Sequence, residues 1–404
     1  MPRMRPPLRH LIPALGIVAA TLAACAELAT EPPADGEIFD APFAELSAVE
    51  LRVFLTGDAE FSRRFAPSTG LGPVFNNASC FSCHSADGRG RLENSLVRLG
   101  TPDNDFLAHL GGPQIQDRAI AGAIAETVPD GVPLSRRLPP PVFGVGLIEA
   151  IPESSILANA DPDDANGDGI SGRPNWVGVH DYVPGGASGA TRTALGRFGR
   201  KAQTATLLEQ VVEAYHQDMG ITSEFRPVEN LNRRAPVSDD RADDPEIPAA
   251  TVHAVVHYVR ALAPPAAGAD TPTRRTGAVL FASVGCAGCH TPALTTGQSA
   301  ISALSNRRVE AYSDFLLHDM GEELSDQRPD GQASGREWRT PPLWGLRLMR
   351  RFLDGDAFLM HDGRARTVEA AILLHGGEGA RARAAFAALD AASRRALLDF
   401  VESR

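Results

Sequence analysis

Hydrophobic residues recur at helical spacing in several segments of this chain. Between 276 and 284, the apolar residues Ala278, Leu280 and Phe281 fit one face of a short amphipathic helix. The same kind of spacing predicts further helices over 48–55, 59–65, 205–215, 249–262, 367–375 and 391–401.

Loops separate these predicted helices. The chain has 38 Gly and 31 Pro, and both residue types interrupt helices and favour turns. A Pro-Pro-Ala-Ala-Gly run that starts at residue 264 is the clearest linker, because prolines end the helix before it. We therefore expect a mainly α protein with a first domain over 42–262, a linker over 263–273 and a second domain over 274–404.

The first 24 residues have the pattern of a signal peptide. Three Arg precede an apolar run over 11–24, which is shorter than the roughly 20 residues that a membrane-spanning helix needs. The run ends in Leu-Ala-Ala followed by Cys25, which resembles the lipobox of bacterial lipoproteins. We expect a lipidated Cys25, a tether over 25–41 and a location on the periplasmic side of a bacterial membrane. The alternative is an ordinary secretory signal that happens to contain a cysteine.

Composition and charge narrow the class of protein. The chain is 43% hydrophobic and 22% charged, which excludes a disordered, coiled-coil or collagen-like protein. Its formal net charge of −11 argues against nucleic acid or an acidic membrane surface as the main partner. Membrane contact is therefore expected only through the lipid anchor, and the charge suits a partner with a basic face.

Four of the five cysteines form two copies of C-x-x-C-H, the attachment signature of c-type haem. Each thiol adds to one haem vinyl group, so the two sulfurs must lie on one side of a turn, and the adjacent His then ligates the iron. The sequence predicts two covalently bound haem c groups. Their attachment residues are Cys80, Cys83 and His84 in the first copy and Cys286, Cys289 and His290 in the second.

Other uses of paired cysteines fit this pattern less well. A redox-active dithiol does not need a His after both copies. A zinc site made by four cysteines needs its two pairs close together, whereas these pairs stand in opposite halves of the chain. Disulfides remain compatible with an exported protein.

The flanks of the second motif support haem attachment. The predicted helix over 276–284 leads into that motif and resembles the first helix of a cytochrome c domain, with Gly277 and Phe281 at its contact with the last helix. The last helix is predicted over 391–401, and the segment before the first motif repeats the pattern. We therefore expect two cytochrome c-like domains, each with one covalent haem, and a loop-rich insertion in the first.

A short acidic stretch has the opening pattern of a calcium loop. Asp164, Asn166 and Asp168 would turn their oxygens inward, and Gly169 would permit the sharp turn. The twelfth position is Asn175, so the bidentate Glu of a complete loop is missing. Calcium binding and a simple Asx-rich turn both remain open.

With these motifs in place, the chain resembles the bacterial di-haem oxidoreductases, relatives of the di-haem cytochrome c peroxidases and of MauG-type enzymes. The likeness covers nearly all of 42–404. Besides the haem motifs, its most specific stretches are 70–77, 196–202, 218–223, 317–321, 338–344 and 361–364.

The resemblance implies a six-coordinate haem in the C-terminal domain. In the peroxidase relatives, a Met or Tyr ligand follows the His of an F-H-D/S-G motif by fourteen positions. Here that His is His361, and the residue at the ligand position is His375. We expect bis-His ligation by His290 and His375 and a low reduction potential. The alternatives are that His375 is a surface residue or that His318, which aligns with a haem-packing His, is the ligand.

The resemblance also implies that the N-terminal haem is the reacting one. In the relatives its distal side is open for peroxide, and a Glu acts there as acid and base. The best match is Glu149, whose apolar neighbours are expected to raise its pKa; the alternative is a helix-start Glu without special role. Trp344 is a candidate for the electron path between the haems, and Arg364 and Arg366 are candidates for contact with haem propionates.

We expect an exported di-haem enzyme that reduces hydrogen peroxide with electrons from a small donor protein, a cytochrome c or a cupredoxin. One alternative is a MauG-like or thiol-oxidising enzyme that withdraws electrons from another molecule. Another is an electron-transfer cytochrome without a substrate of its own. The coordination of the N-terminal haem distinguishes an enzyme from an electron-transfer cytochrome, because an enzyme needs an open position on this haem.

Overall fold

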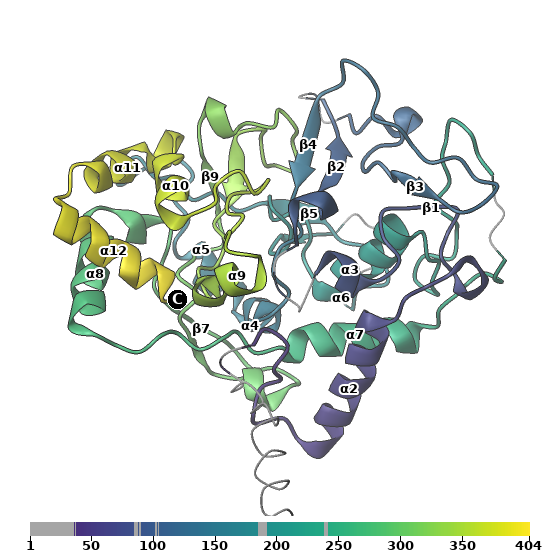
Figure 1. The fold of residues 1–404 in the computed structure, drawn as a ribbon, viewed down its shortest axis with the longest axis horizontal. Coiled ribbons are helices and arrows are strands. Elements are labelled where there is room, and N and C mark those ends of the chain that lie inside the picture. The colour runs from purple at the N-terminus through teal and green to yellow at the C-terminus, as the bar shows by residue number, and fades with distance from the viewer. Residues whose placement is uncertain are drawn as a thin grey trace, which may run out of the picture.

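The computed structural model describes residues 36, 38–84, 88, 90–101, 103, 105–184, 192–237 and 241–404. The predicted signal peptide and Cys25 lie outside these residues. Most of the residues up to 262, here called the first half, occupy the right side of Figure 1, with α5 on the left, and most of the second half, 263–404, occupies the left. None of the helices formed by the described residues has the length and apolar character to cross a membrane.

Eleven α-helices are found among the described residues. The first half contains α2 Ala48–Ser62, α3 Cys80–Cys83, α4 Val145–Ala150, α5 Glu153–Leu157, α6 Leu207–Glu213 and α7 Ala249–Ala261. The second half contains α8 Pro272–Ser283, α9 Leu346–Phe352, α10 Val368–Leu373, α11 Ala380–Ala387 and α12 Ala391–Glu402.

The expectation of a mainly α fold needs correction, because short strands pair across the long loops. Each described sheet is a two-stranded antiparallel ladder. These ladders give buried loop segments partners for their backbone N–H and C=O groups. The pairs are β1 Val74–Phe75 with β3 Arg118–Ala119, β2 Leu96–Leu99 with β4 Leu134–Arg137, β5 Trp176–Gly178 with β6 Thr193–Leu195, β7 Leu294–Thr295 with β8 Arg308–Val309, and β9 Leu317–Asp319 with β10 Glu337–Arg339.

The predicted helices are largely confirmed, with one merger. The two helices expected over 48–55 and 59–65 form a single helix, α2. Ser47 and Glu50 make a capping box at its start. Gly57 does not break α2, because the glycine is buried where α2 crosses α7.

The same helix crossing occurs in both halves. At Gly57 in α2, a Cβ atom would lie 2.1 Å from the carbonyl oxygen of Ala254 in α7. At Gly277 in α8, a Cβ atom would lie 2.1 Å from the carbonyl oxygen of Ala396 in α12. Only glycine permits so close an approach of two helix backbones. The expected contact of Gly277 with the last helix is therefore confirmed, and the first half repeats it.

An aromatic side chain follows each of these glycines by one helical turn. Phe61 contacts Tyr258 of α7 with ring centroids 5.2 Å apart, and Phe281 contacts Phe400 of α12 at 5.5 Å. α4 and α6 also contact α7, as α9 and α10 contact α12. Four helices of each half thus correspond in chain order and in their contacts: α2, α4, α6 and α7 in the first half match α8, α9, α10 and α12 in the second.

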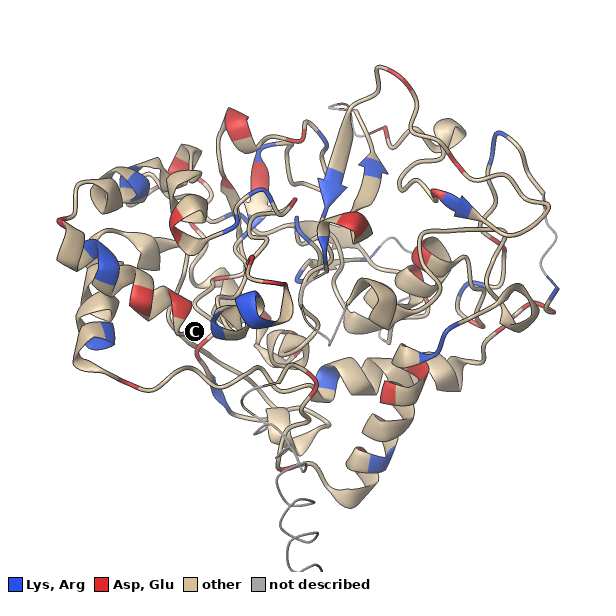
Figure 2. Cartoon of the chain, viewed as in Figure 1, with Lys and Arg blue, Asp and Glu red and all other residues tan. Residues whose placement is uncertain are grey.

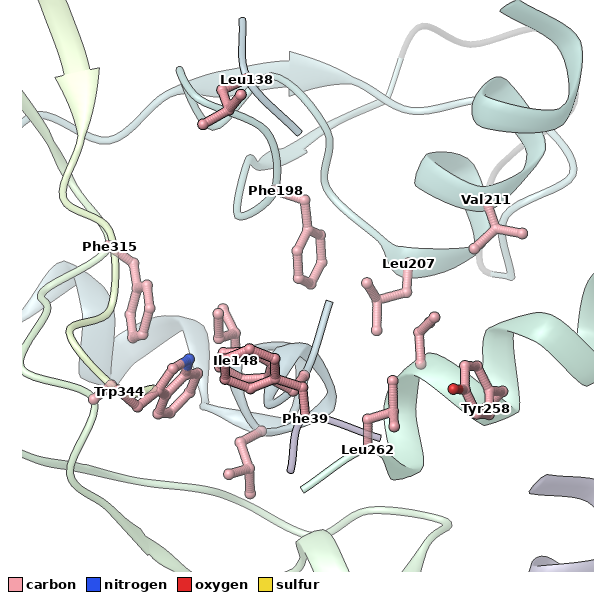
Figure 3. Close-up of a cluster of buried hydrophobic side chains, with 14 of the residues drawn as sticks. Phe39, Leu138, Ile148, Phe198, Leu207, Val211, Tyr258, Leu262, Phe315 and Trp344 are labelled. Carbon is pink, nitrogen blue, oxygen red and sulfur yellow. The ribbon is translucent and has the colours of Figure 1, made fainter. Parts of the chain in front are cut away.

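Buried charges join the halves. Arg137 of β4 pairs with Asp330 at 2.5 Å and with Asp326 at 3.3 Å. Lys201, which is fully buried, donates from Nζ to Asp326 Oδ1 at 2.7 Å. One hydrophobic core also runs through both halves, and Figure 3 shows Phe39 and Phe198 in the same cluster as Phe315 and Trp344. The division into two domains stays a prediction.

Candidate functional site

The first C-x-x-C-H motif forms a short helix that ends at its histidine. Ser79 caps this helix, α3, and the backbone N–H of His84 donates to the carbonyl of Cys80 at 2.9 Å. The ring Nδ1 of His84 donates to the carbonyl of Pro140 at 2.9 Å. Because a carbonyl only accepts, the proton is on Nδ1 and the Nε2 lone pair is left for a metal. Burial lowers the pKa of His84 to about 4, so its ring is neutral at ordinary pH.

The second motif has the same geometry. The backbone N–H of His290 donates to the carbonyl of Cys286 at 3.0 Å, and its Nδ1 donates to the carbonyl of Tyr312 at 2.8 Å. Burial also lowers the pKa of His290 to about 4. Each motif histidine lies 6.2 Å from the phenylalanine of its crossing helix, Phe61 or Phe281, measured between ring centroids.

His375 faces the second site. Its Nδ1 donates to the carbonyl of Ala371 at 2.8 Å, so its Nε2 is also left for a metal. Its imidazole is near enough to contribute to the lowered pKa of His290, after the larger effect of burial. The side chain is half-buried, which does not fit a simple surface histidine.

His318 does not have a nitrogen left for a metal. Its Nε2 bonds Asp314 at 2.9 Å and its Nδ1 bonds Glu378 at 2.7 Å. Burial opposes a charge on this ring, but Asp314, Cys289 and Glu378 outweigh it and raise the pKa of His318 well above its ordinary value. The geometry therefore favours His375 over His318 as the partner of His290.

A cavity opens beside the first motif. It encloses about 1490 Å³ of empty space, part of it open to solvent, and Cys80, Cys83 and His84 form part of its wall. Most of the remaining wall is apolar, as a porphyrin requires. Figure 3 shows several of these side chains, which include Ile148, Phe198, Leu207, Val211 and Trp344.

Arg339 supplies a half-buried cation at the cavity wall. Its side chain donates to the carbonyls of Gly199 and Thr340. Burial lowers its pKa to about 10, and the charge of Asp314 only partly offsets this effect. A carboxylate ligand such as a haem propionate would stabilise this charge. The expected candidates Arg364 and Arg366 pair instead with Asp362 and Asp356.

One cysteine of each motif lacks the electrostatics of a reactive thiol. Burial raises the pKa of Cys83 and of Cys286 to about 11. A reactive thiol needs a lowered pKa, because the thiolate is the nucleophile. None of the four described cysteines forms a disulfide. Two thiols beside a neutral histidine, an apolar cavity and a half-buried arginine together fit a haem.

Glu149 does not line the cavity. Its Oε1 accepts from the backbone N–H of Leu207 at 2.9 Å, and its Oε2 pairs with Arg260 Nε at 2.5 Å. The carboxylate therefore ties the start of α6 to α4 and α7. The expected acid–base role of Glu149 has no support in this geometry, because the side chain leaves α4 on a face that packs against other helices.

The stretch expected to bind calcium forms an Asx-rich turn. Asp164 Oδ1 accepts from the backbone N–H of Gly169, Asn166 Oδ1 from that of Asp168, and Asp168 Oδ1 from that of Ile170. These side-chain oxygens thus accept hydrogen bonds from backbone N–H groups of their own loop. No group of three or more His, Cys, Asp or Glu side chains that could hold a metal occurs in the described part of the chain.

One correspondence between the halves was not visible from the haem motifs. Thr206 caps α6 by accepting from the N–H of Glu209, and Thr367 caps α10 by accepting from the N–H of Ala370. His375 is the eighth residue after its cap, and the eighth residue after Thr206 is Ala214. Ala214 lines the cavity of the first site. The matched threonine caps are the sequence signal that identifies Ala214 and His375 as equivalent positions.

Comparisons with known proteins give a family for the chain. A family model described as "Di-haem oxidoreductase, putative peroxidase" matches residues 28–108 and 116–404. Among solved structures, the chain is similar to Kuenenia stuttgartiensis hydrazine synthase pressurised with xenon, at 15% identity and a TM-score of 0.37, with 100% of each chain covered. No protein of curated function matches this chain.

Proposed function

Because this chain belongs to the di-haem oxidoreductase family, we propose that it is a di-haem c enzyme that reduces hydrogen peroxide with electrons from a small redox protein. The cysteines of the two C-x-x-C-H motifs would carry the haems covalently. His84 would ligate iron in the first site, and His290 and His375 in the second. When bound, the two haems supply iron centres that exchange single electrons with their surroundings.

The observation that carries the proposal is the difference between His375 and Ala214. The helix α10 brings an imidazole to the second site, whereas α6 brings a methyl group to the corresponding place in the first. A methyl group does not ligate iron. On this proposal, position 214 would leave a face of the first haem free for a small oxidant, whereas His290 and His375 would both ligate the second iron.

The repeated helix crossing supports a cytochrome c-like architecture for each half. In both halves a glycine-containing helix precedes the haem motif, and the last helix of the half crosses it at that glycine. The phenylalanine one turn later faces the motif histidine. This arrangement fixes the histidine ring between a carbonyl and an aromatic side chain, with Nε2 directed away from both.

Trp344 is the proposed connection between the two sites. His290 Nδ1 donates to the carbonyl of Tyr312, and the preceding carbonyl, of Ala311, accepts from the N–H of Leu343 at 2.9 Å. The next residue, Trp344, lines the cavity of the first site. A short path of covalent and hydrogen bonds therefore joins the second histidine to the first cavity.

Two glycines hold Trp344 in this place. Gly144 lies against the Trp344 ring, where an added Cβ would be 2.6 Å from Cζ2. Gly345 lies against the Phe143 ring, where an added Cβ would be 2.5 Å from Cζ. Both glycines have positive φ and precede α4 or α9, so a side chain at either would be strained as well as crowded.

The donor and the location complete the proposal. The net charge of −11 favours a donor with a basic face. Figure 2 shows acidic and basic residues interspersed over both halves in this view. The expectation of a basic donor therefore rests on the net charge of the chain and not on a local acidic patch. Lipidation at Cys25 would hold the enzyme on the periplasmic side of a membrane, where small cytochromes c or cupredoxins could reach it.

The test is spectroscopic and kinetic. The protein, made in a host that matures c-type cytochromes, should gain the mass of two haems. One ferric haem should be low-spin and indifferent to peroxide, and the other should be high-spin and react with it. Reduced cytochrome c should then be oxidised when peroxide is added. Two low-spin haems that ignore peroxide would instead identify an electron-transfer protein, and peroxide-dependent oxidation of a protein or thiol alone would identify a MauG-like enzyme.

A further inference from the structure

One wall of the first cavity is a row of side chains spaced four residues apart. Gln210, Ala214 and Asp218 follow one face of α6 and of the π-helical turn Ala214–Asp218 that extends it. All three line the cavity. Single π-turns of this kind are frequent at functional sites. Ala214, which would leave a coordination position of a bound haem open, thus lies between an amide and a carboxyl group.

The second half has the complementary row. Counted from the matched threonine caps, the residues that correspond to Gln210, Ala214 and Asp218 are Ala371, His375 and Gly379. An added Cβ at Gly379 would lie 3.0 Å from the Cβ of His375. In the second half the proposed iron ligand therefore stands between two small residues. In the first half a small residue stands between two polar ones.

Gln210 brings an unsatisfied polar group to the cavity. Its side-chain oxygen is buried and has no hydrogen-bond partner among the described residues. Its neighbours on the wall include the apolar side chains of Leu207, Val211 and Ile148. A buried amide that lacks a partner costs free energy, so a ligand that can both donate to and accept from this amide would be favoured.

Asp218 is the one carboxyl group among the described residues of the cavity wall. Its Oδ1 accepts from Gln114 Nε2 at 2.6 Å, and its backbone carbonyl accepts from the N–H groups of Asn76 and Asn77. The side chain is therefore held in one place.

Burial raises the pKa of Asp218 to about 6, although the Gln114 bond and the charge of Arg98 act against this, and Glu213 adds to it. Cys83 is the other titratable group that interacts with Asp218. A carboxylate with such a pKa is a stronger base than an ordinary Asp and still returns its proton readily near neutral pH.

We propose that Gln210 and Asp218 are the substrate-handling pair of the open site, with Gln210 orienting a small oxidant that carries an O–H group and Asp218 moving its proton. This inference rests on the proposed function, because it needs haem in the first cavity. The carboxylate takes a proton from one oxygen of hydrogen peroxide and returns it to the other, which leaves as water when the O–O bond breaks. Two electrons from the redox-protein donor and two protons from solvent convert the remaining oxygen to the second water.

The experiment uses the haem-loaded protein and hydrogen cyanide as a probe, because this weak acid must lose a proton when it binds to ferric haem. The variants are Asp218→Asn, Asp218→Glu and Gln210→Leu. The matched control is Gln217→Leu, in the same helical turn, whose amide donates to Glu213 at 2.8 Å outside the cavity wall. Haem content and the low-spin signal of the second haem verify the fold of each variant.

Asp218→Asn should slow both cyanide binding and peroxide reduction by roughly a hundredfold. It should also abolish a rise of the peroxide rate as pH increases through about 6. Asp218→Glu should recover part of the rate. Gln210→Leu should weaken both reactions about fivefold, as expected for one hydrogen bond, and Gln217→Leu should match the parent protein.

The outcomes separate this inference from the proposed function. If the parent protein reduces peroxide and the Asp218 and Gln210 variants behave like Gln217→Leu, the role assigned to Gln210 and Asp218 is wrong and the proposed function stands. If peroxide is not reduced but cyanide binding depends on both residues, the proposed function is wrong, and Gln210 and Asp218 still control ligand binding in the first cavity. A parent protein that binds no cyanide has a closed first site, which overturns both.

Discussion

At the scale of single residues, the two sites differ most at Ala214 and His375. If these positions are equivalent, Ala214→His should close the first site with a second imidazole. We expect the high-spin haem to become low-spin, with loss of cyanide binding and of peroxide reduction by more than a hundredfold. Electron paramagnetic resonance and optical titration measure both effects.

The reverse change checks the same equivalence from the other side. His375→Ala should convert the low-spin haem to high-spin and make it bind cyanide, while His84 and the first site stay as they are. An unchanged low-spin signal in this variant would show that another residue ligates the second iron.

The sequence predicted those residues whose chemistry depends on local spacing. Cys80, Cys83 and His84 need only a turn of chain, and the structure places them together on the wall of one cavity. The role of Glu149 stays a prediction, because it depends on where α4 packs, which short motifs do not specify, and the carboxylate lies off the cavity wall. Asp218 lies far from the first haem motif in sequence, so only the fold brings it to that cavity.

At the scale of helices, Gly57 and Gly277 set the two crossings. Replacing either by Ala should push the crossing helices apart, because the new Cβ would overlap a backbone carbonyl oxygen at 2.1 Å. Overpacking of this kind costs about 1–3 kcal/mol, and the thermal midpoint of unfolding should fall accordingly. Gly178→Ala is the control, since nothing lies within 4 Å of a Cβ at that position. Equal midpoints for Gly57→Ala and Gly178→Ala would show that the crossing tolerates a side chain.

The element scale also shows where periodicity stops being informative. Thr56 and Gly57 precede Phe61 with the same spacing as Thr276 and Gly277 precede Phe281. This repeat is readable in the sequence, yet the hydrophobic spacing alone predicts two helices, over 48–55 and 59–65, with Gly57 between them. Its meaning comes from α7, which contacts the glycine from a distant part of the chain.

At the scale of the whole molecule, a buried histidine and two carboxylates join the halves. Glu378 accepts from Ser171 Oγ of the first half at 2.6 Å and from His318 Nδ1 of the second at 2.7 Å. Asp314 holds the other nitrogen of His318. The sequence could not predict this contact, because Ser171, His318 and Glu378 belong to a loop, a short strand and a 3₁₀ turn whose positions follow from the packing of both halves.

Removal of one carboxylate should weaken this contact in a pH-dependent way. The pKa of His318 is raised by its partners, so its stabilising effect is complete below its ordinary pKa of about 6.5 and is lost as the pH rises through the higher value of the folded state. Glu378→Gln should lower the free energy of unfolding by about 1–3 kcal/mol near pH 6, with a smaller difference at alkaline pH where His318 is neutral. Thermal unfolding of the haem-loaded protein from pH 6 to 10 measures this, with the exposed Glu322→Gln as control. A difference between parent and variant that does not change with pH would mean that Glu378 acts only through its hydrogen bonds to Ser171 and to the backbone N–H of Asp319.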